Sequence, residues 1–352
     1  MASQKQEAGA GATAIQSHGN TTITIHRGIG PDEMATIMSA LAAQLPTYVA
    51  LARQIVDKRL QEFQDKVLER IAGSPTANRD AFADPDFQYG IMRAQHAFAR
   101  SGDPAIRDTL VDLIERRSRE NTRTRLALTL NEAMERSAYL TREEFAELTL
   151  VYFIKYTINH NVGNIETFKE YLRSAIFPLL PDISRERASY QFIEAQSCGS
   201  MATFVQGDLH VNILQVYGGI FSKGFSREQL ESHMPEKDVG PLERAALIGP
   251  CLNDPTALQL MRKNQDEFMR DASSTGLPTA ALQSVWNLFQ NTFWRKDELL
   301  DYVGEPALRE LYSLWQETPL HALNLTTVGI AIGHANATRV CSLNADLSIW
   351  IK

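Results

Sequence analysis

The feature that most constrains this chain is a run of apolar residues at three- and four-residue spacing over residues 47–71. Such spacing places the apolar side chains on one face of a helix and the intervening charges on the other. The apolar positions are Val49, Ile55, Val56, Leu60, Phe63, Val67, Leu68 and Ile71. The pattern predicts an amphipathic helix of about 25 residues, longer than the usual roughly 10–14. A helix of this length favours a bundle or an oligomer interface.

Helical spacing dominates most of the remaining sequence. It predicts helices over residues 32–45, 86–101, 104–121, 123–136, 142–159, 165–177 and 184–196, and again from residue 227 to residue 316 with breaks at prolines. Thr141 with Glu144, and Ser226 with Gln229, have the spacing of capping boxes at helix starts. Residues 209–214 are ambiguous between strand and helix. We therefore expect a mainly α fold, with a multi-helix body over residues 86–305.

One short stretch near the start of the chain, SHGNTTITIHRG at residues 17–28, breaks the helical pattern. Its alternation predicts a strand over residues 20–26. A lone strand leaves backbone groups unpaired, so it must pair either with the end of its own chain or with other copies. The long helix favours other copies, and residues 17–72 are predicted to be an oligomerisation segment. Its expected contacts are Ile23, Ile25, Val56, Leu60 and Phe63. Residues 1–16, rich in Ala, Gly and Gln, are predicted to be a disordered tail.

The end of the chain also changes character. Residues 306–352 combine a helix, a weak strand near residues 321–325, the sequence LTTVG, a second helix and an alternating segment at residues 346–351. Thr326 or Thr327 is expected to cap the second helix. This order is similar to the tail of winged-helix proteins and predicts a small α+β C-terminal element.

Composition narrows the class of protein further. The chain has 352 residues and a net charge of −7, with a sequence pI near 5.7. Global attraction to nucleic acid or to anionic membranes is therefore not expected. Three widely spaced cysteines fit a reducing compartment. The N-terminus has no signal-peptide core, and the longest uncharged run, residues 318–338, is too polar to span a membrane. We expect a cytoplasmic protein without a transmembrane segment.

Few residues suggest chemistry. Cys198 could act as a nucleophile with His210 or His160 as its base, although a buried structural thiol explains it better. Arg116, Arg119 and Arg123 share one face of a predicted helix and are candidate phosphate contacts, although interleaved glutamates favour a solvated or ion-paired face. The sequence contains no HExxH, P-loop, GxSxG or dinucleotide-binding motif. We expect no metal, no cofactor and no catalytic residue.

Several stretches together resemble an uncharacterised bacterial family of about 350 residues. They are residues 19–34, 94–121, 130–157, 325–339 and 346–351. The first, GNTTITIHRGIGPDEM, is also similar to segments that precede effector modules in bacterial phage-defence proteins. The LTTVG stretch resembles the tail of helical proteins grouped with abortive infection. These resemblances imply a role in antiviral defence and bring no catalytic residues.

The first hypothesis is a self-assembling, non-enzymatic protein of bacterial defence that senses or binds a protein partner or a phage component. A second hypothesis is a nucleic-acid-binding regulator that uses the C-terminal element and the arginine face. A third is a cysteine-dependent hydrolase.

Overall fold

The computed structural model describes residues 31–202, 207–262, 264–341, 343 and 345–352, and this part of the chain is mainly helical. The predicted mainly α class is therefore confirmed. The α-helices are α1 (Pro31–Gly73), α2 (Pro85–Ser101), α3 (Pro104–Ser118), α4 (Arg125–Ser137), α5 (Arg142–Val151), α6 (Ile165–Tyr171), α7 (Arg187–Ala195), α8 (Leu209–Tyr217), α9 (Arg227–His233), α10 (Glu236–Arg244), α11 (Gln265–Ala272), α12 (Thr279–Gln290), α13 (Lys296–Val303), α14 (Pro306–Glu317) and α15 (Thr327–Cys341). The ambiguous residues 209–214 are thus helical.

Short elements connect these helices. Two π-helical turns, η2 (Tyr152–Tyr156) and η3 (Leu172–Ile176), extend α5 and α6. The 3-10 turns are η1 (Arg79–Ala83), η4 (Phe177–Asp182), η5 (Gly218–Ile220), η6 (Ser273–Thr275), η7 (Pro319–Ala322) and η8 (Leu347–Ile349). Strands β1 (Gly199–Met201) and β4 (Leu323–Leu325) form one antiparallel pair, with Gly199 opposite Leu325. Strands β2 (Ile248–Pro250) and β3 (Leu258–Leu260) form another, with Ile248 opposite Leu260.

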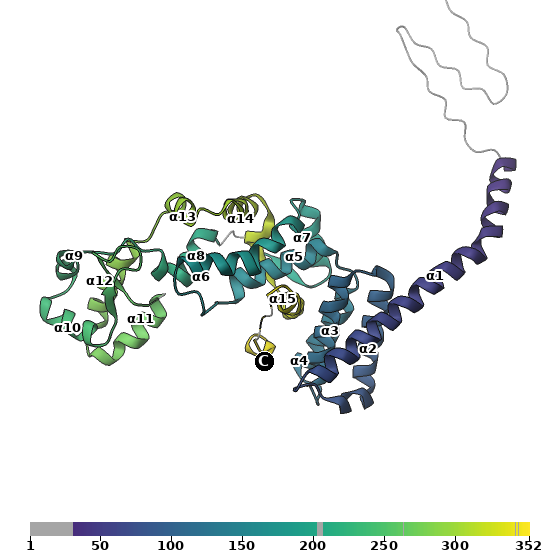
Figure 1. The fold of residues 1–352 in the computed structure, drawn as a ribbon, viewed down its shortest axis with the longest axis horizontal. Coiled ribbons are helices and arrows are strands. Elements are labelled where there is room, and N and C mark those ends of the chain that lie inside the picture. The colour runs from purple at the N-terminus through teal and green to yellow at the C-terminus, as the bar shows by residue number, and fades with distance from the viewer. Residues whose placement is uncertain (1–30, 203–206, 263, 342, 344) are drawn as a thin grey trace, which may run out of the picture. The chain divides into compact units, whose positions relative to one another are not determined.

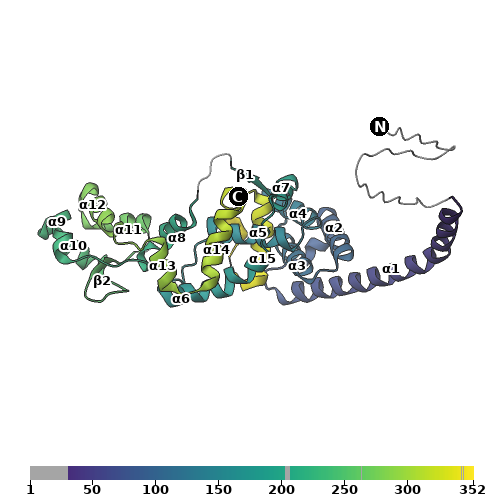
Figure 2. The ribbon, with the colours of Figure 1, turned by 90° about the horizontal axis from the view of Figure 1, so that it is seen from above.

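Residues 56–352 form one compact unit and residues 1–55 another, with the boundary inside α1. The larger unit contains two apolar clusters. The main cluster runs from Phe63 to Ile351, and the second lies among α9 to α12 and strands β2 and β3. In Figures 1 and 2, α9 to α12 gather apart from the helices around α15.

Helix α15 is the central helix of the main cluster and packs against α3, α4 and α5 (Figure 1). Its sequence, TVGIAIGHANATRVC, is rich in small residues, which lets neighbouring backbones approach closely. A Cβ atom added at Gly329 would lie 1.8 Å from the carbonyl oxygen of Cys198, and one at Gly333 would lie 3.0 Å from that of Leu148. The long uncharged stretch is therefore a buried core helix.

Local sequence signals explain where many helices begin. Asp84 and Asp103 cap α2 and α3, each followed by a proline in the first turn. The predicted capping boxes at α5 and α9 are both confirmed. The hydroxyl of Thr326 accepts a hydrogen bond from the Gly329 backbone N–H at 3.2 Å, which confirms the expected cap of α15.

Helix α1 is continuous through Pro46, whereas the sequence suggested separate helices over residues 32–45 and 47–71. The predicted strand at residues 20–26, with Ile23 and Ile25, and the predicted tail at residues 1–16 lie outside the described residues. Among the described residues, one helix, Met34–Gly73, is long and apolar enough to cross a membrane by length and composition alone. No membrane-spanning segment was predicted here from the sequence.

The C-terminal segment differs from its prediction. Residues 347–349 form a 3-10 turn, so the strand expected over residues 346–351 is wrong. Leu347 and Ile351 are buried but Ile349 is 62% exposed, because a helical turn brings residues four apart, and not two apart, to the same side. Strand β4 pairs with β1 and α15 lies in the main core. The described residues thus show no separate winged-helix-like element over residues 306–352.

Candidate functional site

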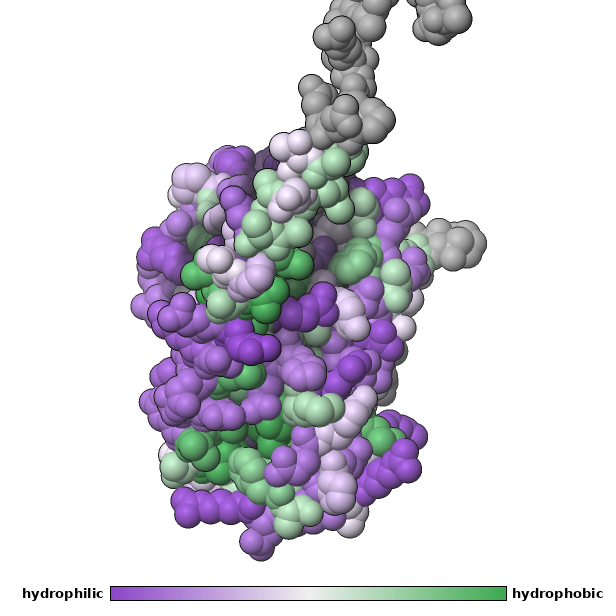
Figure 3. All heavy atoms as spheres, turned by 90° about the vertical axis from the view of Figure 1, so that its right-hand side faces the viewer, coloured by the Kyte–Doolittle hydropathy of each residue, from purple (hydrophilic) through white to green (hydrophobic). Residues whose placement is uncertain are grey.

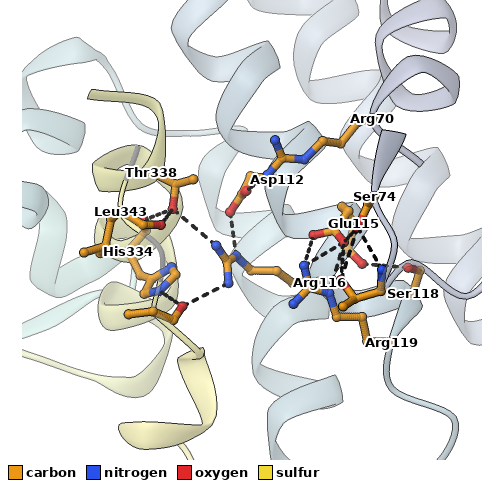
Figure 4. Close-up of polar contacts among 12 residues, drawn as sticks. Arg70, Ser74, Asp112, Glu115, Arg116, Ser118, Arg119, His334, Thr338 and Leu343 are labelled. Carbon is orange, nitrogen blue, oxygen red and sulfur yellow. Dashed lines mark hydrogen bonds and ion pairs between the residues drawn. The ribbon is translucent and has the colours of Figure 1, made fainter. Parts of the chain in front are cut away.

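The arginine face predicted on α3 borders a cavity of about 590 Å³ that lies among the last turns of α1, helix α3 and helix α15. Figure 4 shows the side chains on this side of α3. The charged lining residues are Lys66, Glu69, Arg70, Asp108, Asp112, Glu115, Arg119 and Arg339. The structure therefore does bring one of the predicted arginines, Arg119, to a cavity.

Glu115 is the best-bonded carboxylate of this cavity. Arg119 pairs with it from the next turn of α3, with Nη2 at 2.6 Å from Oε2, and the Ser74 hydroxyl donates to Oε1 at 2.6 Å (Figure 4). Burial alone raises the pKa of Glu115, but the hydrogen bonds from Arg119 and Ser74 outweigh burial and the net pKa is lowered. Glu115 is therefore a paired anion at neutral pH and holds the end of α1 against α3.

Arg116 is buried and is not a surface residue. Its Nε donates to Asp112 at 2.6 Å, and Nη2 donates to the Thr338 hydroxyl of α15 at 3.2 Å. Figure 4 shows the guanidinium directed at α15 and the C-terminal segment. Burial raises the pKa of Asp112, even though Arg116 and Arg70 both donate to it. Arg116 is therefore not available to contact a phosphate, because it joins α3 to α15 and to the C-terminal segment.

Arg123 lies beyond the end of α3 and is exposed, whereas Arg119 is partly buried against Glu115. The three arginines consequently do not form one open face. The cavity has four basic and four acidic lining residues. Two of the basic residues already have carboxylate partners: Arg70 pairs with Asp112 and Arg119 with Glu115. Such a site carries no excess charge to attract a polyanion.

Cys198 occupies an environment that opposes nucleophilic catalysis. The side chain is fully buried and donates to the Gln196 carbonyl oxygen at 3.5 Å. Burial raises the pKa of this thiol to about 12, so the reactive thiolate is not formed at neutral pH. His210, one suggested base, lies with Nδ1 3.2 Å from the Tyr312 hydroxyl, and His160, the other, is exposed. Within the described residues, no group of three or more His, Cys, Asp and Glu side chains is placed to hold a metal ion.

The predicted assembly contacts on α1 separate into two kinds. Val56 is exposed and Leu60 is partly buried, but Phe63 has no exposed surface and stacks on Phe98 with ring centroids 5.9 Å apart. Phe63 is therefore a core residue of its own subunit, which corrects its assignment as an assembly contact.

Two buried ionisable residues, Glu147 and His334, and the partly buried Lys155 were not predicted from the sequence. Burial raises the pKa of Glu147 to about 8 and lowers that of His334 to about 3. Burial also lowers the pKa of Lys155 to about 8, and its ammonium donates to the carbonyl oxygens of His321 and Leu323, at 2.9 and 2.7 Å. Helical periodicity could have indicated them, because each lies at a position where the spacing predicts an apolar side chain.

The fold and the cavity define the class of protein: it is mainly helical, and Arg70 and Arg119 of its cavity form ion pairs with Asp112 and Glu115. A family model matches residues 28–351, so the chain belongs to the family that this model describes. The description of that model, ":-like", names no activity. The match is consistent with the expected family of about 350 residues, and it shows no link to phage defence. No curated protein and no solved structure matches the chain.

Proposed function

We propose that this protein is a self-assembling, non-enzymatic protein of the bacterial cytoplasm that acts in defence against phage by binding a partner. The single observation that carries the assembly part of the proposal is a row of exposed large apolar side chains on α1. These are Met34, Met38, Leu45, Tyr48, Val49, Leu51, Ile55 and Val56, each between 37% and 59% exposed. Apolar surface of this extent marks an interaction site.

The proposal of binding without catalysis is supported by the environment of the candidate residues. Cys198 is a buried thiol with a raised pKa, and two arginines of the α3 cavity, Arg70 and Arg119, are paired with carboxylates. The role in defence comes from the resemblance of residues 19–34 and 325–329 to segments of phage-defence and abortive-infection proteins.

Light scattering on the purified protein tests assembly. The full chain is expected to have the mass of several subunits, and a chain of residues 56–352 the mass of one. Truncation at residue 56 keeps the larger compact unit and the core residues Phe63, Val67 and Ile71.

A matched pair of substitutions tests the surface itself. Val49→Lys is expected to reduce the mass, whereas Leu68→Lys, at an exposed position of the same helix, is expected to leave it unchanged. A full chain that remains a single subunit at high concentration contradicts the proposal.

A further inference from the structure

The first half of α1 differs in composition from the second half. Residues 34–52 are 19 residues without a charge, whereas residues 53–72 contain nine charged residues. A helix that is solvated on one face normally carries charges there, as the second half of α1 does. The first half therefore lacks a charged face, and its polar side chains, Thr36, Ser39, Gln44 and Thr47, are all uncharged.

The length of this uncharged stretch matches a lipid bilayer. At 1.5 Å per residue, 19 helical residues span about 28 Å, against about 30 Å for the hydrocarbon core. Its large side chains are exposed, among them Met38 at 58%, Leu45 at 59% and Leu51 at 52%. In Figure 3 the spheres that adjoin the grey N-terminal residues are mostly pale green and white, whereas purple covers much of the remaining face.

The polar groups within the stretch are compatible with lipid. The Tyr48 hydroxyl donates to the Gln44 side-chain oxygen at 2.6 Å, so the hydroxyl proton and the amide oxygen are paired within the helix. Small residues recur at every fourth position, at Ala35, Ser39 and Ala43. Small residues at this spacing allow close helix packing within a membrane.

The charges that flank the stretch are asymmetric. The 20 residues after it contain five Lys or Arg residues, whereas the 20 residues before it contain one. Positively charged flanks stay on the cytoplasmic side of a bacterial membrane. This asymmetry places the body of the protein, residues 56–352, in the cytoplasm.

We infer that residues 34–52 insert into a lipid bilayer as a single spanning helix and that self-assembly takes place on the membrane. The assembly part of this inference rests on the proposed function, whereas the insertion part does not. A second copy covering the same surface in water is the alternative occupant, and it would cover one face of the helix and leave the other faces, which also carry no charge, in water.

Flotation with vesicles of phosphatidylethanolamine and phosphatidylglycerol tests insertion. The full chain is expected to float with the vesicles and to resist a carbonate wash. Leu45→Arg places a charge near the centre of the stretch and is expected to reduce the membrane-bound fraction relative to the free fraction by roughly a hundredfold. Leu68→Arg is the matched control, because Leu68 is 61% exposed and lies outside the stretch; this variant is expected to float like the original chain.

Light scattering of the same samples in mild detergent separates the two proposals. A chain that does not float but has the mass of several subunits in plain buffer overturns insertion and leaves assembly intact. A chain that floats but is a single subunit in detergent overturns assembly and supports insertion. Equal flotation of the Leu45→Arg and Leu68→Arg variants also overturns insertion.

Discussion

Glu147 offers the most direct test of the packing, because two buried carboxyl groups share one hydroxyl. The Ser189 Oγ lies 2.8 Å from one oxygen of Glu147 and 3.1 Å from one oxygen of Glu144. A hydroxyl has one proton to donate, so Ser189 can donate to only one of the two carboxyl groups at a time. Glu144 accepts hydrogen bonds from the Thr141 backbone N–H and hydroxyl, at 2.7 and 2.6 Å. Glu147 also accepts a hydrogen bond from the Ser184 backbone N–H at 3.2 Å, but burial outweighs its hydrogen bonds and raises its pKa to about 8, so Glu147 holds a proton at neutral pH.

The raised pKa of Glu147 makes the free energy of unfolding depend on pH. The unfolded chain releases this proton near the ordinary pKa of 4.5, whereas the folded chain holds it until about pH 8. The contribution of Glu147 is therefore full below about pH 4.5 and is lost as pH rises to about 8. At about 1.4 kcal/mol per pH unit, the loss amounts to at most about 5 kcal/mol.

Glu147→Gln removes this titration while keeping the shape of a protonated glutamate. The assay is urea unfolding at about pH 5, 6, 7 and 8. This range covers the pH values at which the folded and unfolded chains differ in the protonation of Glu147. The variant is expected to match the original chain near pH 5 and to exceed its unfolding free energy by several kcal/mol near pH 8. Glu143→Gln, at an exposed position one turn earlier, is the control and should show no such trend. A Glu147→Gln variant whose stability difference from the original chain is the same at every pH would refute the reasoning.

Two further substitutions test the core by urea unfolding. Gly329→Ala is expected to lower the free energy of unfolding by at least about 3 kcal/mol, because its Cβ would meet the Cys198 carbonyl oxygen. Gly163→Ala, with open space around it, should change the free energy of unfolding by less than about 0.5 kcal/mol. Equal effects of the two substitutions would contradict the close approach of α15. Arg116→Ala is expected to lower it by about 3 kcal/mol because it leaves a buried carboxylate short of a partner, whereas the exposed Arg123→Ala should be nearly neutral. Normal stability of Arg116→Ala together with lost nucleic-acid binding would instead restore the arginine face.

Much of the helical layout was predictable because its causes are local. The capping boxes at Thr141 and Ser226 and the prolines after Asp84 and Asp103 act within one turn of chain, so they are readable without knowledge of the fold. The error at residues 346–351 arose because three alternating apolar residues are too few to fix the local conformation, and because Leu347 and Ile351 are also four apart, the spacing of a helical turn. Distant contacts decided between them: the Trp350 indole donates to the Tyr156 carbonyl oxygen at 2.7 Å.

The candidate site was less predictable than the fold. Periodicity groups Arg116 and Arg119 on one face but does not tell which face is covered, and here the covering residues come from α15, more than 200 positions along the chain. The same holds for Phe63, whose ring is buried by Phe98. Glu147 looked like an ordinary helix residue because Ser189, which completes its hydrogen bonding, lies on α7.

The sequence alone determined the mainly helical class, the positions of the capped helix starts and the uncharged stretch at residues 34–52, since each depends on residues within a few turns of one another. The tertiary structure alone decided which polar groups are buried, because burial depends on what packs against a side chain. It placed Arg116 and Glu147 inside and left Leu45 and Val49 exposed. The pKa of a buried group such as Glu147 depends both on its burial and on the charges and hydrogen bonds around it, so it could not be read from the sequence.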